Sequence, residues 1–84
     1  MAVKNVDPHK YNTVRGKIGH RIKALRKSRK ATQFAVASAI GLSGGGIISQ
    51  FENGKKGPGI ETLYLMADVL LCDISDLLPS LGDF

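Results

Sequence analysis

Tryptophan is absent from the sequence, cysteine occurs once, and only five residues are aromatic. A chain of 84 residues is one domain's worth, so Leu, Ile, Val and Ala must supply most of the packing. The single cysteine, Cys72, cannot by itself form an intrachain disulfide or a zinc site, and His9 and His20 lie far from it in the sequence. We interpret Cys72 as a small buried apolar residue and expect no metal site.

No apolar run approaches the length of a membrane span, and the N-terminal residues lack the apolar stretch of a secretion signal. A chain with neither a disulfide framework nor a signal is expected to be cytoplasmic. The histidines, the cysteine and the acidic residues form no acid–base pair, nucleophile set or metal-ligand spacing. The glycine run lacks the lysine and the spacing of a phosphate-binding loop. We therefore expect neither an enzyme nor a cofactor.

Basic residues are missing from the last third of the chain. Residues 57–84 contain five acidic residues and no Lys or Arg, whereas residues 1–30 contain ten Lys or Arg and one acidic residue, Asp7. The net charge of +5 is therefore strongly one-sided. Two interpretations remain open: the basic part binds a polyanion such as nucleic acid, or it is a solvated basic helix without a partner.

Apolar residues at helical spacing predict five short helices, and no segment has the pattern of a strand. A first helix at about 13–28 is indicated by one apolar stripe, formed by Val14, Ile18, Ile22 and Leu25. The other four are expected over 34–40, 47–53 and 60–70 and, last, after the capping arrangement of Asp73 and Asp76.

Two of these helices, 34–40 and 47–53, are joined by a short glycine-rich turn. Thr32 is a candidate N-cap for the first of them and Ser43 for the second, and Gly41 can end the first in a left-handed conformation. Ala37 is small enough to let the two helices approach closely. Two such helices and their turn are the signature of a helix-turn-helix motif.

Three apolar residues are predicted to fill the junction of this motif, namely Leu42, Ile48 and Phe51. The exposed side of the second helix is then free to enter a DNA major groove, which is wide enough for one helix.

The order and spacing of the motif resemble the phage repressor and Cro-like helix-turn-helix family, often called the Xre family. The matching segments are Ile18–Arg26, Thr32-Gln33, Val36-Ala37, Ile40–Ser43, Ile48–Lys55, Pro58, Glu61–Leu63 and Asp76–Leu78. The resemblance implies a compact all-α domain of five helices over residues 13–80, with a basic N-terminal arm at 1–12 and a tail at 81–84. It also implies a DNA-binding transcriptional regulator, a repressor, that places its third helix in the major groove.

The resemblance further implies roles for single residues. Gln33 would contact a phosphate, and Gln50 would contact a base or a phosphate. Asn53, Lys55 and Lys56 would flank the DNA backbone. Each of these has a plain alternative, such as a cap residue for Gln33 and solvent exposure for the others.

An acidic residue in this region is expected to support the fold. Glu52 would pair with an arginine of the first helix, either Arg21 or Arg26, because a carboxylate near phosphates is repelled.

The sequence departs from the family between Ser43 and Ile48, where it has four residues in place of three. Three of them are glycines, which supply no side chain to read bases. Either the turn is longer and the third helix starts late, near Gly46, or the glycines let the backbone approach phosphate. Ile47 could touch a thymine methyl group or pack internally. The candidate DNA-binding residues are therefore Gln33, Ser43, Gly44, Gly45, Gly46, Ile47, Ser49, Gln50, Asn53, Lys55 and Lys56.

Apolar residues outside the motif suggest partners. A homodimer through the C-terminal helix is expected from four residues, unless they merely close the monomer core: Leu77, Leu78, Leu81 and Phe84. Phe34 replaces a residue that is often charged in the family, which indicates a partner contact or an N-terminal arm folded over it. The alternative function is a protein-binding adaptor or antitoxin with the same fold.

Overall fold

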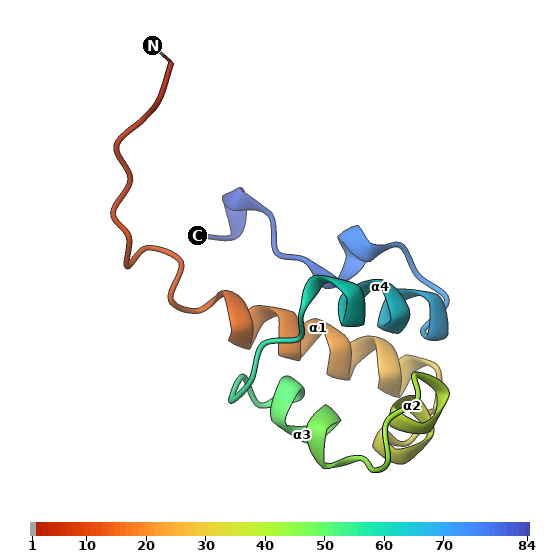
Figure 1. Ribbon diagram of the computed structural model, residues 1–84. Coiled ribbons are helices and arrows are strands. Elements are labelled where there is room, and N and C mark those ends of the chain that lie inside the picture. Colours follow the sequence, from red (N-terminus) through yellow and green to blue (C-terminus); the bar gives the residue numbers. More distant parts are fainter. Residues whose placement is uncertain (1) are drawn as a thin grey trace.

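The chain folds into helices joined by short turns (Figure 1), and each α-helix buries an apolar side. The structure is a computed structural model that describes residues 2–84. It contains four α-helices, namely α1 (Val14–Ser28), α2 (Gln33–Ala39), α3 (Gly46–Glu52) and α4 (Ile60–Val69). Two short 3₁₀ helices follow, η1 (Ile74–Leu77) and η2 (Leu81–Asp83). The described residues contain no strand, which confirms the all-α class.

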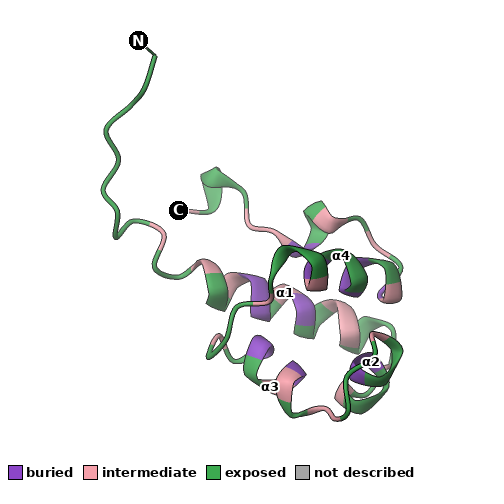
Figure 2. Ribbon diagram, viewed as in Figure 1, coloured by how far each residue is buried: buried purple, intermediate pink, exposed green. Residues whose placement is uncertain are grey.

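The core lies between α1, α2, α3 and α4, whose buried residues face one another in Figure 2. α1 packs against α3 and η1, while α2 packs against α3 and α4. Each α-helix and η1 contribute at least one residue to the core, which consists of Ile18, Ile22, Val36, Ala37, Ile48, Phe51, Leu63, Met66, Ala67, Leu70 and Leu77. Cys72 is half-buried against this core, in keeping with the interpretation as a small apolar residue.

The ends of α2 follow the sequence signals. The Thr32 hydroxyl accepts a hydrogen bond from the backbone N–H of Ala35 at 3.0 Å, so the predicted N-cap is confirmed. Gly41 has a φ of +85°, the left-handed conformation that ends helices at low cost for glycine. The predicted cap of α3 is wrong, because Gly45 and not Ser43 occupies the cap position. α3 starts at Gly46, which is the late start that the extra residue allowed.

The predicted fifth helix is a single 3₁₀ turn, η1, rather than an α-helix. The backbone N–H of Asp73 donates to the Asp76 carboxylate at 3.1 Å, so the expected acidic spacing does shape this turn. Leu77 is fully buried and closes the core. η2 occupies most of the C-terminal tail.

α1 and α3 touch through a glycine. A Cβ built on Gly19 would lie 2.1 Å from the carbonyl oxygen of Phe51 and 2.9 Å from that of Glu52. These distances are far below van der Waals contact, and both neighbours are backbone atoms that cannot swing away. Gly19 therefore sets how closely α3, the second helix of the motif, approaches α1.

We expect Gly19→Ala to destabilise the domain by about 2 kcal/mol or more, because the added methyl group must push α1 and α3 apart. Gly16→Ala is the matched control, since a Cβ at Gly16 in the same helix meets nothing within 4 Å. The control should be neutral or more stable by up to about 1 kcal/mol, because alanine favours helix over glycine. Urea unfolding followed by circular dichroism measures both changes, and equal effects would contradict the close-contact argument.

Candidate nucleic-acid interface

α3 divides cleanly into a buried and an exposed side. Ile48, Phe51 and Glu52 are buried, and Ile48 is completely covered. Gln50 and Asn53 are exposed and lie on the opposite side of the helix. The only charged residue of α3 is Glu52, so the exposed side carries no charge of its own.

The buried carboxylate of Glu52 holds three helices together. Nε of Arg26, from α1, donates to Oε2 at 2.6 Å, and Nη2 of Arg26 donates to Oε1 at 3.1 Å. Nε2 of Gln33, from α2, donates to the same Oε1 at 3.0 Å. The remaining Arg26 nitrogen, Nη1, donates to the carbonyl oxygen of Ala31 at 2.9 Å. Of the two predicted partners for Glu52, Arg26 is therefore the right one.

Electrostatics in this cluster favour the charged forms of both groups. Burial alone would raise the pKa of Glu52, but hydrogen bonds from Arg26 and Gln33 and the nearby charges of Arg26 and Lys23 hold it below its ordinary value. The hydrogen bond to Glu52 raises the pKa of Arg26, so the arginine also stays charged. The side chains of the pair are only 11% and 2% exposed, so a buried ion pair stays intact at neutral pH.

The same geometry gives Gln33 a structural task that the sequence did not reveal. One N–H of its amide is committed to Glu52, while the predicted phosphate contact would have to come from the rest of the group. The amide is thereby fixed at the start of α2, beside the cap of α3.

The glycine-rich turn has one constrained position and two open ones. A Cβ at Gly45 would lie 3.1 Å from the backbone nitrogen of Phe34, so this residue packs against the start of α2. At Gly44 and Gly46 a Cβ would meet nothing within 4 Å. The turn thus presents bare backbone at the exposed end of α3.

A hollow of about 350 Å³ opens beside this turn, and its walls are Leu42, Ser43, Gly44, Gly46 and Ile47. The prediction that Leu42 fills the motif junction is wrong, because the side chain remains 38% exposed. Ile47 is half-buried against the core, which supports packing over full exposure. Ile48 and Phe51 fill the junction as expected.

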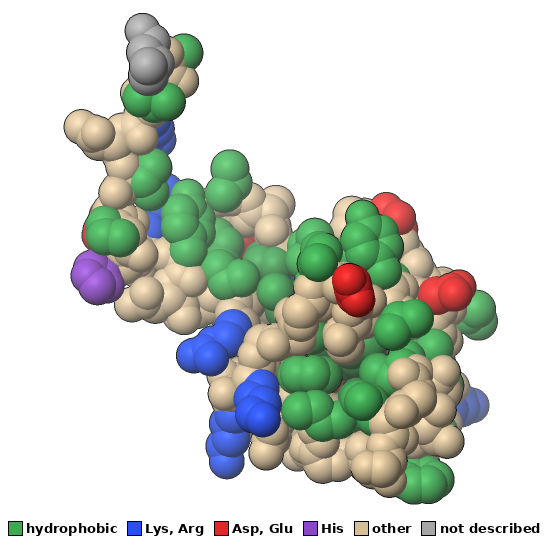
Figure 3. Space-filling model, viewed as in Figure 1, with side chains coloured by type: hydrophobic (Ala, Val, Ile, Leu, Met, Phe, Trp, Pro, Cys, Tyr) green, Lys and Arg blue, Asp and Glu red, His purple; other side chains and the backbone are tan. Residues whose placement is uncertain are grey.

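Basic side chains lie where the loop after α3 meets the start of α1. Lys55 and Lys56 are exposed on this loop, and a Cβ at Gly57 would touch the Arg15 side chain at 3.0 Å. Gly54 turns the loop with a φ of +71°. Within residues 2–84, none of these three cations makes an ion pair. On the face drawn in Figure 3, several Lys and Arg side chains lie together at the lower left of the helical body, and most of the visible acidic side chains lie at its upper right.

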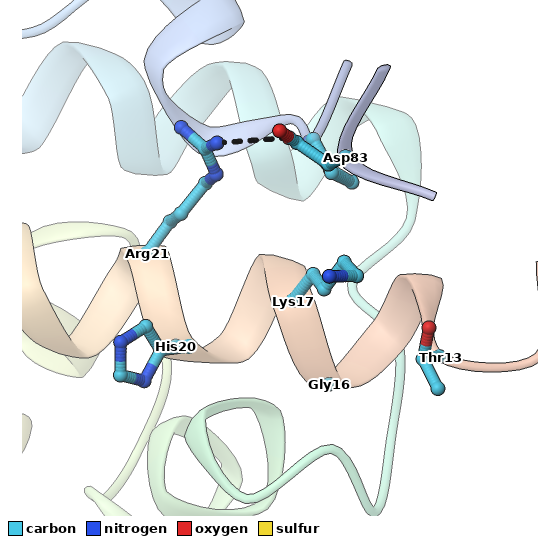
Figure 4. A pocket seen from close by; sticks show the side chains of 7 residues that line it. Thr13, Gly16, Lys17, His20, Arg21 and Asp83 are labelled. Carbon is cyan, nitrogen blue, oxygen red and sulfur yellow. Dashed lines mark hydrogen bonds and ion pairs between the residues drawn. The ribbon is translucent and has the colours of Figure 1, made fainter. Parts of the chain in front are cut away.

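A second hollow, of about 560 Å³, lies between α1 and the C-terminal segment (Figure 4). Arg21 bridges it with an ion pair to Asp83 at 3.1 Å. Nζ of Lys17 lies 5.2 Å from the ring centre of Phe84, and the Tyr11 ring meets the same ring edge-on at 5.0 Å. The two terminal segments are thus fastened to each other and to α1.

The C-terminal residues predicted to form a dimer surface differ in how far they are exposed. Leu77 is fully buried in the monomer core and Phe84 contacts Tyr11, so neither is free for a partner. Leu81 is 75% exposed. Phe34 is 64% exposed, so of the two alternatives for it the N-terminal arm folded over it is wrong.

No helix in residues 2–84 is long and apolar enough to cross a membrane. No group of three or more His, Cys, Asp or Glu side chains is placed to hold a metal ion in the same part of the chain.

The family model for helix-turn-helix proteins, HTH_3, matches residues 22–77, which covers α2, the glycine-rich turn and α3. The chain belongs to the HTH_3 helix-turn-helix family. No curated protein sequence matches it significantly.

Solved structures resemble this HTH_3 chain over most of its length. The P22 c2 repressor, crystallised with a synthetic operator, is 36% identical, with 73% of this chain and 91% of that chain covered and a TM-score of 0.67. The restriction-modification controller protein C.AhdI from Aeromonas hydrophila is 22% identical, with 76% and 96% covered and a TM-score of 0.71, and shows the fold alone.

An enzyme also contains a similar domain. The hydroxypropylphosphonic acid epoxidase from S. wedmorenis is 28% identical, with a TM-score of 0.73. The match covers 80% of this chain but only 35% of the epoxidase. It therefore concerns one part of that protein.

Most predicted site residues of this HTH_3 chain lie on α3 or in the loop that follows it. Gln50, Asn53, Lys55 and Lys56 are exposed on or just after α3, and Ser49 is half-buried and accepts a hydrogen bond from the Asn53 amide at 3.3 Å. Sequence reasoning missed Arg15, whose contact with the loop of Lys55 appears only in the fold. The one available signal was its place in the basic N-terminal third.

We expect Glu52→Gln to destabilise the domain by about 3 kcal/mol, because it leaves the Arg26 guanidinium buried without its counter-charge. The control is Asp83→Asn, which removes the much more exposed ion pair with Arg21 and should cost less than about 1 kcal/mol. Urea unfolding at pH 7 compares the two. Equal losses would contradict a special role for the buried pair.

Glu52 should also make stability depend on pH. Its pKa is lowered in the folded protein, whereas a glutamate in the unfolded chain has a pKa of about 4.3. Its stabilising contribution is therefore complete above that pH and is lost as the pH falls through the lower folded value. The difference in unfolding free energy between wild type and Glu52→Gln should shrink as the pH is lowered below about 4. A difference that stays constant from neutral to acid pH would contradict this assignment.

Proposed function

We propose that this protein is a sequence-specific DNA-binding transcriptional regulator, a repressor, that places α3 in the major groove of duplex DNA. The observation that carries the proposal is the division of α3. Its only carboxylate is buried under the motif by Arg26 and Gln33, so its exposed side offers neutral polar groups and bare backbone. Family membership and the similarity to the P22 c2 repressor, which was crystallised with an operator, support the same function.

Phosphate contacts come from both edges of α3 in this proposal. Lys55 and Lys56 follow its C-terminal end, and Arg15 from α1 lies beside their loop. Gln33 stands at the other edge, and the second N–H of its amide can donate to a phosphate oxygen directly or through water. Cations with no ion pair attract the phosphate backbone most strongly, because no carboxylate competes for them.

In this proposal, only a few side chains contact the DNA bases. Gln50 is the one long polar side chain on the exposed side of α3, and glutamine can pair with adenine through two hydrogen bonds. Ser43, Ser49 and Asn53 add shorter polar groups. The open positions at Gly44 and Gly46 let the backbone come close to DNA, while Ile47 offers its remaining exposed edge to a thymine methyl group.

We also propose that two copies act together. One such domain makes few base contacts, and a homodimer doubles them by reading paired half-sites. The sequence assigned the dimer surface to the C-terminal residues, of which Leu81 and half-buried Leu78 have exposed area.

A second candidate function is a protein-binding adaptor or antitoxin with the same fold. The exposed ring of Phe34 at the start of α2 favours it, because an isolated aromatic side chain beside bare glycines suits a protein partner. The two functions differ in one simple experiment: the DNA binder loses affinity for random duplex linearly in log salt, whereas a pure adaptor binds duplex poorly at any salt.

We expect Lys55→Ala and Lys56→Ala each to reduce the slope of log affinity against log salt by about 1, because each removes one phosphate contact. Affinity should fall alike on all duplex sequences. The control, Asp68→Asn, changes the net charge by one unit on the acidic side of the molecule and should leave the slope unchanged. A change of similar size but opposite direction in Asp68→Asn would show that only overall charge matters.

Gln50→Ala should cost about 1–3 kcal/mol on the preferred duplex and nothing on random duplex, because it removes a base contact. The preferred duplex comes from selection out of a random pool, and its symmetry reports the arrangement of copies. Ser38→Ala, an exposed change on α2, is the control. Binding without enrichment of any sequence would contradict sequence-specific regulation.

A further inference from the structure

The outward side of α4 carries large apolar side chains that nothing in the described chain covers. Ile60 is 62% exposed, Tyr64 60% and Leu65 49%. Residues three or four apart share one side of a helix, so Glu61 and Asp68 lie beside them. A hollow of about 530 Å³ is lined by Glu61, Tyr64, Leu65 and Asp68. We call these five residues the α4 strip, and its chemistry is apolar with negative charge.

The N-terminal arm, residues 2–12, has the complementary chemistry. Val3 and Val6 are exposed, at 78% and 52%, although valine favours burial. Lys4 and Lys10 outnumber the single acidic residue, Asp7. Residues 2–7 have no regular secondary structure and project away from the helical body (Figure 1). Apart from Tyr11, which packs against Phe84, the arm is thus an extended, basic and partly apolar segment.

The arm is placed to meet another molecule rather than its own α4. It leaves the body at the start of α1 and points away from α4 in Figure 1. The long dimension of the molecule, 46 Å against 23 and 20 Å, reflects this projection. An exposed apolar surface with opposite charge on another copy is the most complementary place for it on the described chain.

We propose that the N-terminal arm of one copy docks on the α4 strip of a second copy, and that two copies exchange arms in this way. The valines contact Ile60, Tyr64 and Leu65, and the lysines face Glu61 and Asp68. Two such contacts related by a two-fold axis close the assembly at a dimer. α3 and α4 lie on opposite sides of α1, so the exchange leaves the exposed side of α3 free (Figure 1). This inference rests on the homodimer of the proposed function and places its interface on the arm and the α4 strip in place of the C-terminal residues.

The first test measures the mass of the full chain by light scattering after gel filtration, over a range of concentrations. Wild type should be a dimer. Leu65→Asp on the α4 strip and Val6→Asp on the arm should each weaken association by about tenfold or more, because a buried, unpaired carboxylate is unfavourable. Leu71→Asp, at a leucine that is 77% exposed just after α4 and outside the strip, is the matched control and should remain a dimer. All three sites are exposed, and circular dichroism verifies that each variant folds.

The decisive test mixes the two interface variants. Leu65→Asp keeps an intact arm and Val6→Asp keeps an intact α4 strip, so an equimolar mixture retains one of the two docking contacts. A heterodimer should form at concentrations at which each variant alone is monomeric. A wild-type monomer, a dimer unaffected by Val6→Asp, or a mixture that stays monomeric would overturn the arm exchange. Salt titration of duplex binding by the same variants reports separately on the proposed function.

Discussion

The buried ion pair between Arg26 and Glu52 is the interaction on which the rest of this structure depends. It joins α1 to α3, and the Gln33 amide extends it to α2. A lone carboxylate in this position would be strongly unfavourable, and it would repel DNA if it turned outward. Paired inward, it fixes the angle of the motif and removes the only negative charge from the exposed side of α3. One cluster therefore serves both folding and the proposed binding.

Glycine has two opposite uses around this cluster. Gly19 permits a close approach of α1 and α3 that no side chain would allow, and so supports the rigid part of the motif. Gly44 and Gly46 have open space around them. Because they have no side chains, the N-terminal end of α3 offers fewer groups that could read bases. The domain thus combines a firmly held motif with a recognition segment of few side chains. Specificity in the proposed function must then rest on Gln50, on short polar groups and on DNA shape.

Local signals in the sequence were enough for much of this architecture. The apolar stripe of α1, the Thr32 cap and the left-handed Gly41 each depend on neighbouring residues only, and all three were predicted. The choice between Arg21 and Arg26 as the partner of Glu52 could not be made, because it depends on how α1 is rotated against α3. For the same reason we did not foresee three other features: the close contact of Gly19 with α3, the hydrogen bond from the Gln33 amide to Glu52, and the exposure of Leu42. The terminal contacts through Phe84 join residues far apart in sequence, and no local pattern indicates them.

Charge is unevenly distributed along the chain, because ten of the twelve Lys and Arg residues lie in residues 1–30 and five of the seven acidic residues lie in residues 57–84. The central claim is that the exposed side of α3, freed of its carboxylate, is the surface that meets DNA. Nuclear magnetic resonance of the labelled protein with a short duplex tests it most directly. The account predicts that the backbone amide signals of Gly46, Gln50 and Lys55 shift on binding, while those of Glu61 and Asp68 on α4 do not. Shifts confined to α4, or an α3 unaffected by duplex DNA, would contradict it.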